Sequence, residues 1–193
     1  MNILEKANSF YKEYTKADSW ETAIFTNVKR MENDTRGRFG ESIVSEALHL
    51  NKNFVFDMDY TNSNKHFDGH YDLKVNGRRI EVKTSCQTSA GVWQHEPLYA
   101  EEVCDLVIFI DFGYDFFHIS VIPSKDLPLG RTSPYFINKK GTLRKKKDDG
   151  YKLDFSKKTI SDLIGFKLTK TFEADATIQD IANFIGGKLD EFV

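Results

Sequence analysis

The chain has 193 residues, of which 40% are hydrophobic, 13% aromatic and 29% charged, and its formal net charge at pH 7 is −2. This length and composition suit a globular protein with a sizeable core and exclude a disordered, collagen-like or coiled-coil chain. A charge so close to neutral also excludes a protein that coats nucleic acid over its whole surface, but not an enzyme that confines its cations to one surface.

No apolar run approaches the ~20 residues that a membrane span needs, and the first residues lack the basic and apolar regions of a secretory signal. Cys86 and Cys104 show no metal-type spacing, which suggests a reducing compartment. Cys86 has no evident base partner and is expected to be a buried or semi-buried thiol. We therefore expect a cytoplasmic protein with no membrane association. Because no Pro- or Ser-rich linker divides the chain, residues 1–193 are expected to form a single domain.

The N-terminal third shows the helical spacing of apolar residues, and it predicts helices over residues 3–16, 20–31 and 36–50. The apolar stripe of the third helix consists of Phe39, Ile43, Ala47 and Leu50. Glu41 falls at the edge of that stripe. It is either a functional carboxylate beside the buried face or an exposed first-turn residue favoured by the helix dipole.

The middle of the chain predicts strands over residues 53–59, 70–75, 78–84, 104–112 and 116–123. The run over 104–112 is almost continuously apolar, which is typical of a central strand covered on both faces. A last helix is predicted over residues 178–192. Helices, a strand-rich centre and a final helix indicate an α/β or α+β domain built on one sheet.

Asn76-Gly77 lies between two alternating runs and predicts a hairpin with a two-residue type I′ turn, which requires positive φ at both positions. This turn pairs Val75 with Arg78 and sets the register of both strands. The side chains that share the core face of the hairpin are then Leu73, Val75, Ile80 and Val82.

On the other face the same register places Asp72 directly opposite Glu81, with Lys83 on the same side. Two facing carboxylates repel unless a cation lies between them, and the candidates are Lys74, Lys83 or a divalent metal ion. Two carboxylates with water and carbonyl oxygens suit Mg²⁺, with Mn²⁺ as an alternative. A lysine beside such an ion can lower the pKa of an attacking water or stabilise a phosphoryl oxygen.

Three segments together resemble the PD-(D/E)xK nuclease superfamily, which includes many type II restriction endonucleases and Holliday-junction resolvases. They are Gly37-Arg-Phe-Gly-Glu41-Ser-Ile-Val, His70-Tyr-Asp72-Leu and Ile80-Glu-Val-Lys83-Thr. The resemblance covers about residues 36–122. It implies an α/β fold with a restriction-endonuclease-like core, a mixed central sheet flanked by helices. Residues 1–35 would form an N-terminal helical extension, and residues 123–193 a C-terminal accessory part.

The resemblance also implies the site and the activity. Asp72 and Glu81 would be the metal ligands, Lys83 the catalytic lysine, and Glu41 the acidic residue of the first core helix. Asp68, four residues before Asp72, is a rival ligand. The implied activity is Mg²⁺-dependent hydrolysis of phosphodiester bonds in double-stranded DNA.

Three functions remain open: a type II restriction-like endonuclease, a structure-selective junction or repair nuclease, and a catalytically inactive DNA-binding module of the same fold. Cleavage of both strands with one active site per chain favours a homodimer, and the N-terminal helices are the candidate dimer surface.

The dense basic run of the chain predicts phosphate contacts, although a solvated loop is the alternative. Its residues are Lys139, Lys140, Arg144, Lys145, Lys146 and Lys147. Base contacts are expected from the segment 85–98, unless it is an ordinary connection. Its candidate side chains are Gln87, Trp93, Gln94 and His95.

Overall fold

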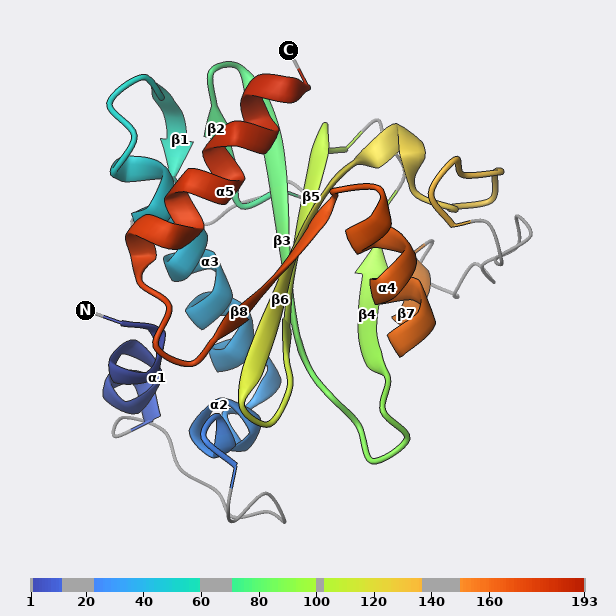
Figure 1. Cartoon of the computed structure of the whole chain (residues 1–193). Coiled ribbons are helices and arrows are strands. Elements are labelled where there is room, and N and C mark those ends of the chain that lie inside the picture. The colour runs from blue at the N-terminus through green and yellow to red at the C-terminus, as the bar shows by residue number, and fades with distance from the viewer. Residues whose placement is uncertain (1, 12–22, 60–70, 100–102, 137–149, 193) are drawn as a thin grey trace.

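The computed structural model describes residues 2–11, 23–59, 71–99, 103–136 and 150–192. Its centre is a six-stranded sheet in the order β1–β2–β3–β5–β6–β8 (Figure 1). Strands β3 and β5 run parallel, and the other neighbouring pairs run antiparallel, so the sheet is mixed, as predicted. The six strands are β1 (Phe56–Asp59), β2 (Leu73–Val75), β3 (Arg78–Cys86), β5 (Leu106–Phe112), β6 (Phe116–Pro123) and β8 (Thr169–Glu173).

Helices cover one face of this sheet, and a second, two-stranded sheet with one further helix covers the other (Figure 1). The helices of the first face are α1 (Ile3–Tyr11), α2 (Thr26–Arg30), α3 (Asn33–His49) and α5 (Ile178–Glu191). The opposite face carries β4 (Trp93–Leu98), β7 (Tyr151–Phe155) and α4 (Lys157–Gly165), with the short 3₁₀ helix η1 (Ser124–Asp126) after β6. The predicted α/β class is thereby confirmed. None of the described helices has the length and apolar character of a membrane span.

Strand β5 is the central strand that its apolar run predicts, because all seven of its residues are buried. Ile108 and Ile110 belong to the core beneath α3 and α5. Val107 and Phe109 point the other way, into the core beneath β4 and β7. A strand with a core on each face cannot alternate apolar with polar residues, which explains its nearly continuous apolar sequence.

The predicted hairpin is confirmed. Asn76 and Gly77 have φ of 49° and 76°, the left-handed values that a type I′ turn requires. Val75 pairs with Arg78, and the ladder continues to Leu73 opposite Ile80. The four predicted core-face residues, Leu73, Val75, Ile80 and Val82, all lie in the core beneath α3 and α5.

Two predictions in the helical part are wrong. Residues 23–25 are not helical, and helix α2 starts only at Thr26. The reason is tertiary: the Phe25 amide donates to the Tyr114 carbonyl at 3.2 Å, and the Phe25 ring packs 5.1 Å from the Phe112 ring. Leu50 is 49% exposed rather than part of the apolar stripe, because α3 ends at His49 and the chain turns away.

Candidate active site

The candidate site lies where β2 ends and β3 continues. The β2–β3 ladder stops at Leu73 opposite Ile80, whereas β3 extends to Cys86 and stays paired with β5 along that length. From Glu81 onward, therefore, β2 no longer lies beside this edge of β3. Because β2 ends here while β3 continues, backbone N–H and C=O groups on this edge of β3 are available to side chains or to a ligand.

Asp72 occupies the edge that β2 vacates. The Asp72 amide donates to the Ile80 carbonyl at 2.9 Å, and its carboxylate Oδ2 accepts the amide N–H of Val82 at 2.8 Å. Asp72 thus lies just before β2, and the strict cross-strand pairing with Glu81 predicted from the sequence is not formed. Its side chain nevertheless reaches the backbone of the residue directly after Glu81.

Glu81 and Lys83 project from the same face of β3 and form an ion pair. Glu81 is buried at 8% exposure. Burial, followed by the charge of Asp72, raises the pKa of Glu81 from 4.5 to about 7, and the nearby Lys83 counteracts only part of this shift. Burial also raises the pKa of Asp72, although the Val82 hydrogen bond and the charge of Lys83 lower it. The two carboxylates therefore lack sufficient compensating charge.

Lys83 is the cation of the cluster. Burial by itself lowers the pKa of Lys83, but the charge of Glu81 and the hydrogen bond to it outweigh burial, so the pKa lies above its ordinary value. Asp72 and Tyr99 act in the same direction. Tyr99, one residue after β4, is a neighbour of the site that sequence reasoning missed, and no motif marks it.

Glu41 approaches the cluster from α3. It is half-buried, and its charge contributes to raising the pKa of Glu81. Gly40 allows α3 to lie this close to β3, since a Cβ atom at Gly40 would lie 1.8 Å from Thr84 Oγ1. The structure therefore brings together Asp72, Glu81 and Lys83, while Glu41 on α3 acts on Glu81 through its charge.

The donor chemistry of this cluster fits a hard divalent cation. No group of three or more His, Cys, Asp or Glu side chains with metal-site geometry occurs among the described residues. Mg²⁺ does not need one, because it keeps several waters and commonly binds through one or two carboxylates. Asp72 and Glu81 supply such a pair. Burial and, after it, the charge of Asp72 raise the pKa of Glu81, and added positive charge would oppose both effects.

Several predicted residues lie outside the described part of the chain. These are Asp68 and the basic residues Lys139, Lys140, Arg144, Lys145, Lys146 and Lys147. Their predicted roles stay predictions. Residues 12–22 of the N-terminal extension also lie outside it, whereas Ile3 and Ala7 of α1 and Val28 of α2 are buried in the chain's own core.

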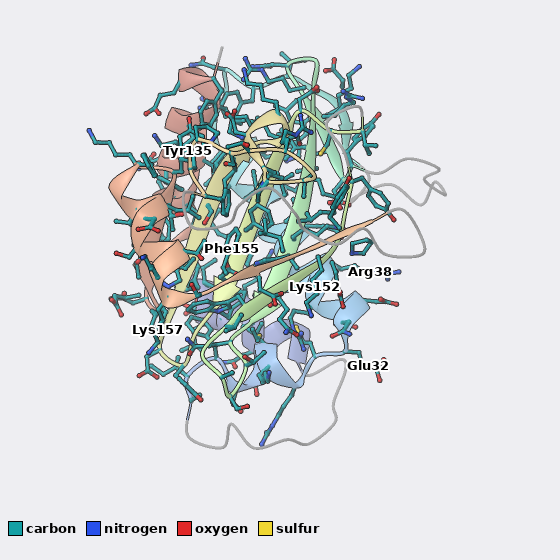
Figure 2. All side chains as sticks on the ribbon, turned by 90° about the vertical axis from the view of Figure 1, so that its right-hand side faces the viewer. Glu32, Arg38, Tyr135, Lys152, Phe155 and Lys157 are labelled. Atoms are coloured by element: carbon teal, nitrogen blue, oxygen red, sulfur yellow. The ribbon has the colours of Figure 1, made fainter. Side chains whose placement is uncertain are left out.

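The suggestion that Trp93 and His95 contact bases is wrong, because both side chains are buried. The Trp93 indole N–H donates to the Phe112 carbonyl at 2.9 Å. His95 pairs with Asp111 at 2.9 Å, and both of these side chains have zero exposure. Gln87 is buried as well, so Gln94 is the exposed member of this set. Strand β4 buries alternate residues along its first part. Figure 2 labels Phe155 of β7, the strand that pairs with β4.

No known protein-family model matches the chain, and no curated protein matches its sequence. Among solved structures, the chain is similar to one described as "Restriction endonuclease in complex with substrate DNA". The two sequences are 12% identical, the match covers 97% of this chain and 90% of the other, and the TM-score is 0.48. The site residues are therefore assigned from their own contacts.

Proposed function

We propose that this protein is a divalent-metal-dependent nuclease that hydrolyses phosphodiester bonds in double-stranded DNA, with Mg²⁺ as the ion. The observation that carries this proposal is the cluster of Asp72, Glu81 and Lys83 at the point where β2 leaves β3. Two undercompensated carboxylates next to a protonated lysine suit the binding of a cation and of a phosphate together. The resemblance of the same three residues to the PD-(D/E)xK motif supports this interpretation.

Each side chain has a distinct task in this proposal. Asp72 and Glu81 would hold the ion, which when bound supplies a Lewis acid beside the scissile phosphate. The Val82 N–H orients the Asp72 carboxylate through its hydrogen bond to Oδ2. Lys83, kept protonated by Glu81, can donate to a phosphoryl oxygen and stabilise the negative charge that develops in the transition state. Glu41 adds a third carboxylate from the side of α3.

The finer part of the proposal is a type II restriction-like enzyme that acts as a homodimer. One site per chain must cut two strands, and a two-fold dimer on a two-fold DNA site places one site on each strand. Sedimentation with and without duplex DNA tests this arrangement. A monomer at micromolar concentration under both conditions would contradict it.

The nuclease proposal is tested by incubating supercoiled plasmid with the protein in Mg²⁺ or in EDTA. We expect nicking and linearisation in Mg²⁺ only, and loss of both in Glu81→Gln. Glu173→Gln, an exposed carboxylate on β8, is the matched control and should cleave like the wild type. Activity that survives EDTA, or equal activity in Glu81→Gln and the wild type, would refute the site. Sequencing the DNA ends then tests the finer assignment, since random ends exclude restriction-type recognition.

A further inference from the structure

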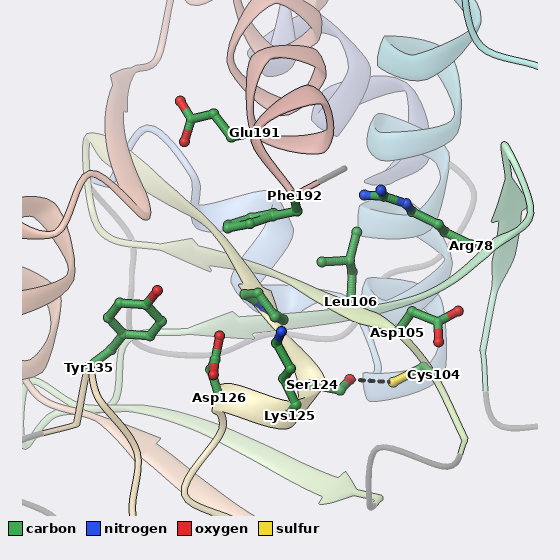
Figure 3. Close-up of a pocket in the computed structure, with 11 residues that line it drawn as sticks. Arg78, Cys104, Asp105, Leu106, Ser124, Lys125, Asp126, Tyr135, Glu191 and Phe192 are labelled. Carbon is green, nitrogen blue, oxygen red and sulfur yellow. Dashed lines mark hydrogen bonds between the residues drawn. The ribbon is translucent and has the colours of Figure 1, made fainter.

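A second feature of the molecule is a cavity of about 660 Å³ at the end of the sheet where β3 and β5 begin and β6 ends. Its walls come from the starts of β3 and β5, from η1, and from the C-terminal end of α5 (Figure 3). The volume falls in the range of about 300–1,000 Å³ typical of small-molecule sites. Asp72, Glu81 and Lys83 do not line it, so it is separate from the candidate active site.

The charges around the cavity favour an anion. Of its three acidic residues, Asp105 is ion-paired with Arg79 at 2.9 Å and Glu191 with Lys188, two cations that do not line the cavity. This leaves Asp126 as the acidic residue set against the two lining cations, Arg78 and Lys125. In contrast, Lys125 is exposed and has no ion pair or hydrogen bond within the described part of the chain.

A second cation lies across the cavity from Lys125 in Figure 3. Arg78 uses Nη1 to donate to the Leu189 carbonyl at 3.1 Å, which fixes its guanidinium at the end of α5. A guanidinium has five N–H donors, so most of them can still bind a ligand. Lys125 and Arg78 therefore supply positive charge to the same cavity from η1 and from β3.

Two aromatic rings complete the cavity. Phe192 lies at the end of α5, and Tyr135 lies in the segment after η1; both are half-buried. Tyr135 is held in place by an edge contact with Phe166, with ring centroids 5.3 Å apart. Asp126 adds a carboxylate that can accept hydrogen bonds, and Figure 3 shows it beside Lys125. Flat rings, two cations and one acceptor match the base, the phosphate and the amino or hydroxyl groups of a nucleotide.

We propose that this cavity binds a single unstacked nucleotide, with the base against Phe192 or Tyr135 and the phosphate at Lys125 and Arg78. The nucleotide can be free, or it can be part of DNA bound at the active site. The second case rests on the nuclease function proposed above. Arg78 and Glu81 are three residues apart on β3, about 10 Å along the strand, and their side chains project from opposite faces of the sheet. One DNA strand advances about 3.4 Å per nucleotide, so the cavity would lie at least about three nucleotides from the cleaved bond.

Binding is tested first with deoxyadenosine monophosphate and the full-length protein in EDTA, by isothermal titration. We expect a Kd of about 1 mM or lower. Lys125→Glu should weaken it about tenfold or more, the effect of losing a charge-assisted hydrogen bond, and Phe192→Ala should weaken it as well. Lys158→Glu, on the exposed face of α4, is the matched control and should bind like the wild type. No binding by the wild type, or equal losses in Lys125→Glu and Lys158→Glu, would overturn the proposal.

A second measurement distinguishes the two sources of the nucleotide. A duplex carrying 2-aminopurine is mixed with the protein in Ca²⁺, and its fluorescence rises if the base leaves the stack. A rise that Lys125→Glu abolishes identifies a nucleotide of the DNA, whereas monophosphate binding without any rise identifies a free nucleotide. The monophosphate titration needs no cleavage. Cleavage without monophosphate binding therefore refutes the cavity alone, and monophosphate binding without cleavage refutes the nuclease function alone.

Discussion

The carboxylate of Asp72 accepts the backbone N–H of Val82 at 2.8 Å, across the gap left where β2 stops pairing with β3. In a longer hairpin, a main-chain carbonyl of β2 would accept the N–H of Val82. Here the Asp72 side chain accepts that N–H, and it also lies close enough to Glu81 to raise the pKa of Glu81. One residue thus closes the end of the β2–β3 ladder and supplies a carboxylate to the candidate metal site.

Because Asp72 has both roles, two substitutions of it should affect cleavage and stability differently. Asp72→Asn keeps an oxygen that can accept from Val82 but removes the charge, so we expect cleavage to be lost while the urea midpoint stays near that of the wild type. Asp72→Ala also leaves the Val82 N–H without its acceptor, which should cost about 1–3 kcal/mol of unfolding free energy. Wild-type cleavage by Asp72→Asn would exclude Asp72 as a metal ligand.

Substitution of Lys83 should slow DNA cleavage much more than it weakens DNA binding. Lys83→Ala removes the ammonium that Glu81 holds, and we expect the cleavage rate to fall about 10²–10³-fold, as for other lost transition-state donors. Binding of duplex DNA in Ca²⁺, measured by fluorescence anisotropy, should change little by comparison. Equal losses of binding and cleavage would instead identify Lys83 as a simple phosphate contact.

The raised pKa of Glu81 predicts how the metal-free protein responds to pH. The folded state holds a proton up to about pH 7, whereas the unfolded state releases it near the ordinary value of 4.5. The contribution of Glu81 to unfolding free energy therefore falls as pH rises between these values, by on the order of 3 kcal/mol. Urea unfolding in EDTA should show this decline in the wild type and a smaller one in Glu81→Gln. An equal decline of unfolding free energy with pH in the wild type and in Glu81→Gln would contradict this prediction. Added Mg²⁺ should stabilise the wild type most at the alkaline end.

The contact between α3 and β3 predicts contrasting effects of two glycine substitutions. Gly40→Ala places a Cβ 1.8 Å from Thr84 Oγ1, so it should destabilise the protein by about 1–3 kcal/mol. Adding Thr84→Ala removes that atom and should restore part of the loss. Gly187→Ala on α5 is the matched control, because its Cβ would meet nothing within 4 Å. Without a clash, the alanine should stabilise the helix by about 0.5–1 kcal/mol. A thermal melt compares the three variants, and a neutral Gly40→Ala would show that α3 can move away from β3.

Local chemistry in the sequence was sufficient for the hairpin and for the central strand. Asn76 and Gly77 tolerate positive φ, so they determine the turn, and the turn determines which residues of β2 and β3 face the core. Strand β5 is recognisable because residues buried on both faces must be apolar along the whole strand. These features depend on neighbours in the chain or on burial alone, and a single sequence contains that information.

The remaining features depend on contacts between distant segments. Asp72 accepts the Val82 N–H because pairing between β2 and β3 ends at Leu73. The alternation of side chains in the sequence does not show where this pairing ends. His95 looks like a base-contacting side chain in the sequence, but the packing of β4 over β5 buries it against Asp111. Glu41 acts on the pKa of Glu81 from α3, a helix that Gly40 allows to pack closely against β3. In each case the sequence supplied the chemical group, and the tertiary structure decided its partner, because the partner lies on an element far away in the chain.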